Sequence, residues 1–188
     1  MARDQRRRDI AEALLTVAGE RGLHAATMRA VAAQAGVSLH LVQHYFETKE
    51  QLMLYALRYL AERMAERLEK RFAGLDDDPR AVIEAVLQEA LPTDAQSRVF
   101  HLVYTSYAVL AVTDPTLAAQ PLLTAPNAME DFIAAQLSRA SPGLDARTEA
   151  VALLAMSAGL NAAVLAGQRT ADDAMAVLRH QLDRLCPR

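Results

Sequence analysis

Apolar residues recur every three or four positions along most of this chain, which is the spacing of one face of an α-helix. In residues 6–21 the stripe comprises Ile10, Leu14, Val17 and Ala18. The 188 residues include only seven glycines and seven prolines, and Ala, Leu, Glu and Arg dominate. The pattern predicts an all-α protein of about nine helices. The expected helices span residues 6–21, 28–35, 39–46, 49–73, 79–91, 94–112, a segment from 115 to 137 that Pro121 and Pro126 interrupt, 146–167 and 171–185.

The stretch from residue 27 to 52 carries the densest local signals. Thr27 and Ser38 are expected helix N-caps, because a hydroxyl there can accept a bond from a free backbone N–H of the first turn. Gly36 lies between the two short helices, where a glycine can adopt the left-handed conformation that ends a helix. Thr48 and Gln51 form a capping-box pattern at the start of the next helix. Two short helices around such a turn predict a helix-turn-helix, which places its second helix in the DNA major groove.

Residues 7–53 resemble the DNA-binding domain of the TetR family of transcriptional regulators. The matching motifs are Glu20-Arg21-Gly22, Thr27 with Val31-Ala32, Ala35-Gly36-Val37-Ser38, Phe46, and Thr48-Lys49-Glu50 with Leu52. The resemblance implies an N-terminal three-helix helix-turn-helix domain over residues 1–50. It also implies a C-terminal helical domain for ligand binding and dimerisation over residues 51–188.

The resemblance assigns DNA contacts by position. The expected set is Thr27, Arg29, Ser38, Leu39, His40, Leu41, Gln43, His44, Tyr45 and Lys49. Thr27, Ser38 and Lys49 stand at helix starts, which suit phosphates. His44 and Tyr45 are expected at phosphates as well, and Arg29 at a phosphate or a base edge.

The centre of the second helix departs from the family pattern. Leu39 and Leu41 cannot hydrogen-bond to bases, but they can contact thymine methyl groups. They are alternatively core residues, as Val42 is expected to be. Gln43 can pair with adenine or with a phosphate, and His40 is bulkier than the usual residue at its position. The operator sequence therefore cannot be inferred from the family.

The charge of the chain is weaker evidence for DNA binding than the helix-turn-helix pattern. The net charge is −3, although residues 1–50 hold seven Lys or Arg against six Asp or Glu. Arg3, Arg6, Arg7 and Arg8 form a basic N-terminal run that is either a DNA-contacting arm or a solvated tail.

The helix expected over residues 146–167 is apolar on nearly every side, unlike the surface helix of a monomer. It lies either at the centre of a domain or between two subunits. The resemblance implies the second arrangement, a homodimer through the last two helices, about residues 146–185. A dimer presents two recognition helices to a palindromic DNA operator.

The family also implies a pocket for a small-molecule effector, apolar or amphipathic, whose binding releases a repressor from DNA. Candidate lining residues, each of which can instead be simple core, are Met64, Phe100, Tyr104, Tyr107, Met129, Phe132 and Asn161. The alternative is a helical DNA-binding module that lacks a small-molecule effector and is controlled by a protein partner.

Several other classes of protein are not expected. Cys186 is the single cysteine, which excludes an intramolecular disulfide and a cysteine-rich zinc site. His40 and His44 have helical zinc spacing but no third ligand nearby. The segment 155–159 approaches a nucleophile-elbow sequence, but that motif needs a preceding strand. We expect no enzyme activity, cofactor or membrane segment, because no catalytic motif, signal peptide or run of 18 apolar residues is evident, and we expect a cytoplasmic protein.

Overall fold

The fold was analysed in a computed structural model, which describes residues 2–75, 77–113, 115–119 and 121–187, with the side chains of residues 2, 116, 117 and 121–127 excepted. Within these ranges every regular element is a helix, so the all-α prediction is confirmed. The elements are α1 (Ala2–Arg21), the 3-10 helix η1 (Leu23–Ala25), α2 (Met28–Gln34), α3 (Leu39–Tyr45), α4 (Lys49–Phe72), α5 (Pro79–Glu89), α6 (Ala95–Ala111), α7 (Pro115–Ala118), α8 (Pro121–Ala140), α9 (Ala146–Leu165) and α10 (Ala171–Leu185).

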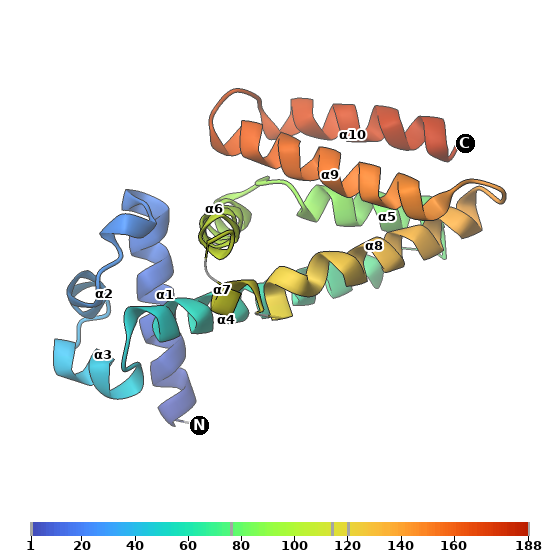
Figure 1. The fold of residues 1–188 in the computed structure, drawn as a ribbon. Helices are drawn as coiled ribbons and strands as arrows, with labels where there is room; N and C mark the ends of the chain where they lie inside the picture. The colour runs from blue at the N-terminus through green and yellow to red at the C-terminus, as the bar shows by residue number, and fades with distance from the viewer. Residues whose placement is uncertain (1, 76, 114, 120, 188) are drawn as a thin grey trace.

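The helices form two groups joined by α4 (Figure 1). Helices α1, α2 and α3 make one end of the molecule, and α5, α8, α9 and α10 stack at the other. Helix α6 crosses between the groups and packs against α1, α4 and α9. This arrangement places α6 and α4 where a movement in one group can reach the other.

The N-terminal hydrophobic core draws on more than the first three helices. It contains Val42 and Phe46 of the α3 region, but also Leu57 of α4 and Val103 and Tyr107 of α6. The proposed domain boundary after residue 50 therefore falls inside α4, a helix that contributes its first three turns to this core. That boundary stays a prediction.

A second core lies between the C-terminal helices. Its fully buried side chains include Leu87 of α5, Ile133 of α8, Leu153 of α9 and Leu178 of α10. Helix α10 is strongly amphipathic and turns one stripe toward this core, made of Ala174, Met175, Leu178, Leu182 and Leu185.

Two expected helix boundaries differ from the structure. The segment after residue 115 is two helices, α7 and α8, and α8 continues through Pro126 without a break. Helix α1 begins at Ala2, before the expected start at residue 6, so the arginine-rich run is helical. Ala, Arg and Gln are good helix formers, which explains why the helix extends over these residues.

Candidate DNA-binding surface and ligand site

Three side-chain caps build the helix-turn-helix from local bonds. Thr27 Oγ1 accepts from the Ala30 N–H at 3.1 Å, and Ser38 Oγ accepts from the Leu41 N–H at 3.1 Å. Thr48 Oγ1 accepts from the backbone N–H of Gln51 at 3.2 Å. Each hydroxyl thus satisfies a free N–H of a helix start and keeps its own hydrogen for an outside acceptor.

The turn between α2 and α3 depends on one glycine. Gly36 has φ of 65°, and the next N–H, that of Val37, donates to the Ala32 carbonyl at 3.0 Å. This is the glycine-ended helix stop in which a bond reaches back five residues. It sets the angle at which α3 leaves α2.

Helix α3 has a buried side and an exposed side. Val42 is fully buried, which confirms its expected core role, and Phe46 at the helix end is 1% exposed. His40, Gln43 and His44 lie on the opposite, exposed side. The exposed side therefore carries hydrogen-bonding groups that can face a DNA groove or backbone.

The two leucines of α3 are not equivalent. Both are half-buried, but Leu39 packs against the N-terminal core, whereas Leu41 lies outside that cluster. Of the expected DNA-facing residues, Tyr45 also packs on the core and contacts the His44 ring edge-on at 5.5 Å. Thr27, Arg29 and Ser38 are exposed.

The Arg7 side chain packs against two aromatic rings of the protein. Its guanidinium lies over the rings of Phe46, 5.1 Å from the centroid, and Tyr55, at 4.6 Å. Such cation–π contacts fix the start of α1 against the end of α3 and the first turns of α4. Arg3, Arg6 and Arg8 are exposed on the same helix.

Lys49 is turned toward the interior of the molecule. It is half-buried, and its Nζ donates to the Leu23 carbonyl of η1 at 3.5 Å. The side chain that the sequence assigns to a DNA phosphate therefore faces a gap between the two groups of helices.

Of the seven residues expected to line one effector pocket, five are divided between the two cores. Phe100, Tyr104 and Tyr107 of α6 pack with the N-terminal core. Phe100 and Tyr104 are stacked at 5.8 Å, and burial raises the pKa of Tyr107 well above its usual value. Their position makes α6 part of the DNA-binding end as much as of a ligand-binding domain.

The other candidates lie toward the C-terminal end. Met129 and Phe132 of α8 pack on the second core, with Phe132 stacked on Phe72 of α4 at 5.9 Å. Met64 of α4 and Asn161 of α9 are both buried.

Asn161 has a second buried polar residue beside it on α9. Ser157, one helical turn earlier, is 2% exposed, and its hydroxyl has no hydrogen-bond partner among the residues that the structure describes. Asn161 is 8% exposed, and its Oδ1 lacks a partner too. Two adjacent buried polar groups without partners cost stability, so they mark a place where a ligand or water can bind. The i, i+4 spacing of polar residues on an otherwise apolar helix was the signal available in the sequence.

A charged network joins α4, α5 and α6. Glu89, 7% exposed, pairs with Arg67 at 2.8 Å and with Arg71 at 3.0 Å. Arg67 also bonds to Asp94 at 2.6 Å, which lowers the pKa of that carboxyl to about 2. The ring of His101 on α6 bonds to the Glu89 backbone carbonyl at 3.1 Å, and burial lowers its pKa. The network fixes the second half of α4 to α5 and α6.

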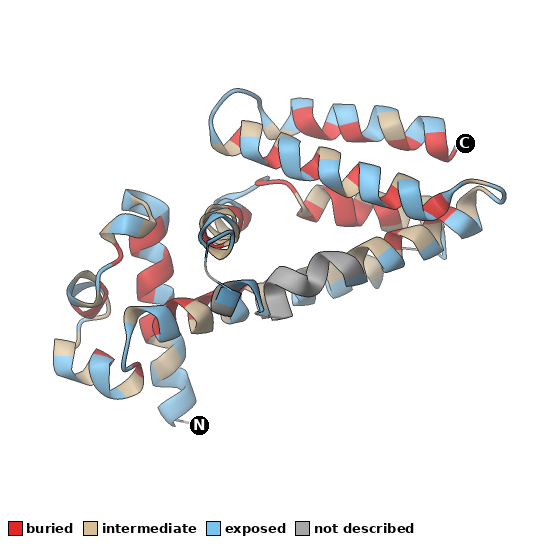
Figure 2. Cartoon of the chain, viewed as in Figure 1, coloured by how far each residue is buried: buried red, intermediate tan, exposed pale blue. Residues whose placement is uncertain are grey.

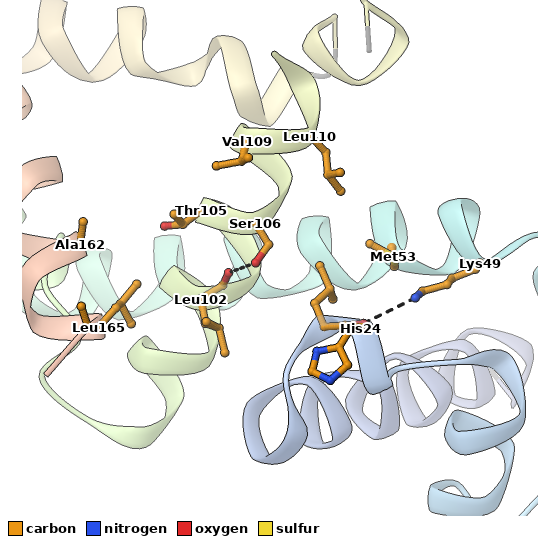
Figure 3. A pocket seen from close by; sticks show the side chains of 12 residues that line it. His24, Lys49, Met53, Leu102, Thr105, Ser106, Val109, Leu110, Ala162 and Leu165 are labelled. Atoms are coloured by element: carbon orange, nitrogen blue, oxygen red, sulfur yellow. Dashed lines mark hydrogen bonds between the residues drawn. The ribbon is translucent and has the colours of Figure 1, made fainter. Parts of the chain in front are cut away.

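A groove of about 730 Å³ lies between the two groups of helices (Figure 3). One wall comes from η1 and the start of α4, and the other from α6 and the end of α9. None of the seven expected effector residues lines it.

Helix α9 exposes much of its apolar surface. Among the described helices, α9 alone is long and apolar enough to cross a membrane. Only 28% of its 18-residue apolar segment is buried in the protein. Figure 2 shows exposed bands along α9. From residue 151 to the end of α9, the exposed residues are small residues and one valine: Val151, Ala152, Ala155, Ala158, Gly159 and Ala162.

In the part of the chain that the structure describes, no three His, Cys, Asp or Glu side chains converge on a metal position.

Two family models match this chain. Residues 10–56 match the bacterial regulatory proteins of the tetR family, and residues 79–187 match the C-terminal domain of BetI-type transcriptional repressors. The transcriptional regulator PksA of Bacillus subtilis (strain 168) is 35% identical over 94 residues, which are 50% of this chain and 45% of PksA. The chain thus spans about half the length of that relative.

Solved structures match over nearly the whole length. A transcriptional regulator from Rhodococcus sp. RHA1 is 30% identical, with 95% of each chain covered and a TM-score of 0.83. A transcriptional regulator from Saccharomonospora viridis, solved with choline, is 22% identical, with 96% of each chain covered and a TM-score of 0.87, a likeness of fold.

Proposed function

The chain belongs to the TetR family of bacterial transcriptional regulators, and from this premise we propose that it is a dimeric repressor which a small-molecule effector releases from a palindromic operator. The observation that carries the proposal is the capped helix-turn-helix, with Val42 and Phe46 buried beneath an exposed polar side of α3. We divide it into a DNA-binding domain, residues 1–50, and a ligand-binding and dimerisation domain, residues 51–188. We place its activity in the cytoplasm, where its DNA target would be.

On DNA, α3 enters the major groove. Thr27 and Ser38 keep a free hydroxyl hydrogen for phosphates, and the exposed Arg29 adds a cation beside them. His40, Gln43 and His44 present donors and acceptors from the exposed side, while Leu41 offers an apolar contact to a thymine methyl. Lys49 reaches a phosphate after leaving the Leu23 carbonyl. Tyr45 and Leu39 contribute at the edge of the contact, because both already pack on the core.

Paired leucine variants test the docking of α3. Leu41→Ala should change sequence preference at one operator position, with about 1 kcal/mol of discrimination lost from the apolar contact to a thymine methyl group and little change in stability. Leu39→Ala should mainly lower the melting temperature. The measurement is a gel-shift titration against the promoter of the adjacent gene and against randomised DNA, at rising salt. Equal affinity of the wild type for both DNAs would rule out an operator.

The dimer forms through α9 and α10, about residues 146–185. The exposed small-residue face of α9 supports this, because small side chains allow helices to approach closely, and Val177 of α10 continues the apolar surface with 39% exposure. A second copy, and not lipid, covers this face. Light scattering should find a dimer for the wild type and a monomer for Ala158→Arg. The control, Ala135→Arg on the exposed side of α8, should stay dimeric.

The effector is a small amphipathic molecule with one hydrogen-bonding end. Its polar end bonds to the Ser157 hydroxyl and to Asn161 Oδ1, which are buried and lack hydrogen-bond partners among the described residues. Its apolar part lies toward the aromatic and methionine side chains of α4, α6 and α8, namely Met64, Phe100, Tyr104, Tyr107, Met129 and Phe132. Release from DNA requires that the ligand bind the DNA-incompetent state more tightly than the competent one.

A thermal-shift series tests the effector site. Choline and a diverse set of small amphipathic alcohols and amines are the probes. Any compound that raises the melting temperature of the wild type should fail to raise that of Asn161→Leu, whereas Ala135→Arg should respond as the wild type does. No response from the wild type to any compound would favour the alternative, a DNA-binding module controlled by a protein partner.

A further inference from the structure

The groove between the two groups of helices has the size of a ligand site. Its volume of about 730 Å³ lies within the range of pockets that bind small molecules. Apolar side chains from both walls line it, among them Met53 of α4, Leu102 and Val109 of α6, and Leu165 of α9 (Figure 3). A molecule in the groove would touch the DNA-binding end and the regulatory end at once.

Among the described residues, Lys49 is the charged residue that lines the groove, and no Asp or Glu does. His24 lines the groove as well. Glu50, next to Lys49 in the chain, is exposed and does not line the groove. The groove therefore offers a positive end to a ligand that is otherwise held by apolar contacts.

Lys49 is poorly satisfied where it lies. It is half-buried, and among the described residues its hydrogen bond is to the neutral Leu23 carbonyl at 3.5 Å, the long limit for such a bond. A partly desolvated ammonium is stabilised more by a carboxylate than by a carbonyl, because the charge-assisted bond is shorter and stronger. An anionic group between η1 and α4 would provide that partner.

The apolar wall of the groove is exposed to water. Val109 is 65% exposed and Leu110 is 46% exposed at the end of α6. Both line the groove, and Leu110 and Lys49 bound it in the same view (Figure 3). An alkyl chain laid over this wall would remove apolar surface from water.

We propose that this groove is a second ligand site, separate from Ser157 and Asn161, and that it binds an amphipathic carboxylate. The carboxylate pairs with Lys49, and the alkyl chain covers Val109 and Leu110. Because Lys49 is also the proposed phosphate contact of α4, the bound anion competes with DNA for the same ammonium. The site itself does not depend on that DNA role.

Calorimetric titration of the full chain with sodium decanoate, below its micelle-forming concentration, tests the site. Decanoate should bind, and decyltrimethylammonium, with the same chain and the opposite charge, should bind at least tenfold more weakly. Lys49→Gln should weaken decanoate binding at least tenfold. The absence of decanoate binding, or equal binding of the two probes, would overturn the proposal.

Matched variants locate the binding. Val109→Glu places a carboxylate in the groove and should weaken decanoate binding at least tenfold. Val112→Glu, at an 84% exposed position outside the groove, should leave it unchanged. Loss of decanoate binding in Asn161→Leu would assign the ligand to the internal site instead. A change in mass by light scattering for Val109→Glu would make the groove an interface between copies and overturn the ligand site.

Discussion

The helix-turn-helix and the C-terminal helices are held in place by contacts of different range along the chain. In residues 27–52, each cap joins residues three apart, and the glycine turn closes within five residues. In the C-terminal end the Arg80 side chain reaches Asp183 and the Cys186 carbonyl, and the Ser141 hydroxyl reaches the Leu185 carbonyl. The first region can be built from its own sequence, whereas the second needs the folded chain.

Helix α6 shows what this difference means for function. In sequence it lies well inside the expected regulatory domain, yet Val103 and Tyr107 belong to the N-terminal core. Gly19 of α1 faces it so closely that an added Cβ would lie 2.7 Å from Val99 Cγ2. Because the DNA-binding end is packed onto α6, a ligand that moves α6 also moves the recognition helix.

Truncating one buried side chain in each region is the strongest test of this coupling. Phe46 is 1% exposed and Leu178 is fully buried. Phe46→Ala should destabilise by about 3–5 kcal/mol and Leu178→Ala by about 2–5 kcal/mol, from lost burial and the cavity left behind. Scanning calorimetry should find one shared transition that both variants lower. A second transition with an unchanged midpoint in Phe46→Ala would mean that the two ends unfold independently.

Two glycine substitutions should have opposite effects in the two regions. Gly36→Ala forces a side chain into a left-handed conformation, with φ of 65°, and should cost about 1–2 kcal/mol. Gly159 lies inside α9 with no atom within 4 Å of an added Cβ. There alanine should stabilise the protomer by about 0.5–1 kcal/mol. Urea denaturation followed by circular dichroism measures both.

The effect of Gly159→Ala also depends on dimer formation. If helices cross closely at Gly159 in the dimer, Gly159→Ala should weaken association while the isolated protomer gains stability. Dilution experiments separate the change in association from the change in protomer stability. Stabilisation by Gly36→Ala would contradict the turn geometry.

The smallest expected effect concerns pH. Burial lowers the pKa of His101, so the folded state takes up a proton less readily than the unfolded state. The contribution of His101 to folding stability is therefore complete above the ordinary pKa of 6.5. It is lost as the pH falls toward the lower pKa of the folded state. The pKa of Asp94 is lowered as well. Its contribution to folding stability is therefore present above pH 3.8 and is lost as the pH falls to about 2.

Variants assign the pH effect to one region. The urea midpoint of the wild type should fall between pH 7.5 and 5.5, and His101→Gln should flatten that fall. His180→Gln, on the exposed side of α10, should keep the wild-type slope. An unchanged slope in His101→Gln would trace the effect to other groups.

The sequence predicted the fold class, the family and the frame of the helix-turn-helix, because these rest on periodicity and on bonds between near neighbours. The caps at Thr27 and Ser38 and the buried Val42 are present in the structure as expected. The apolar character of α9 was also evident in the sequence, because it is a property of composition.

Only the tertiary structure decided what lies between the elements. It turned Lys49 toward Leu23, stacked Arg7 on Phe46 and Tyr55, and divided five of the seven expected effector residues between two cores. It also left the Ser157 hydroxyl and Asn161 Oδ1 buried without hydrogen-bond partners among the described residues, and opened a groove with Lys49 in its wall. The physical reason is that a helix start is determined by the few residues around it. The environment of a buried charge or amide is determined by helices that are distant in the chain.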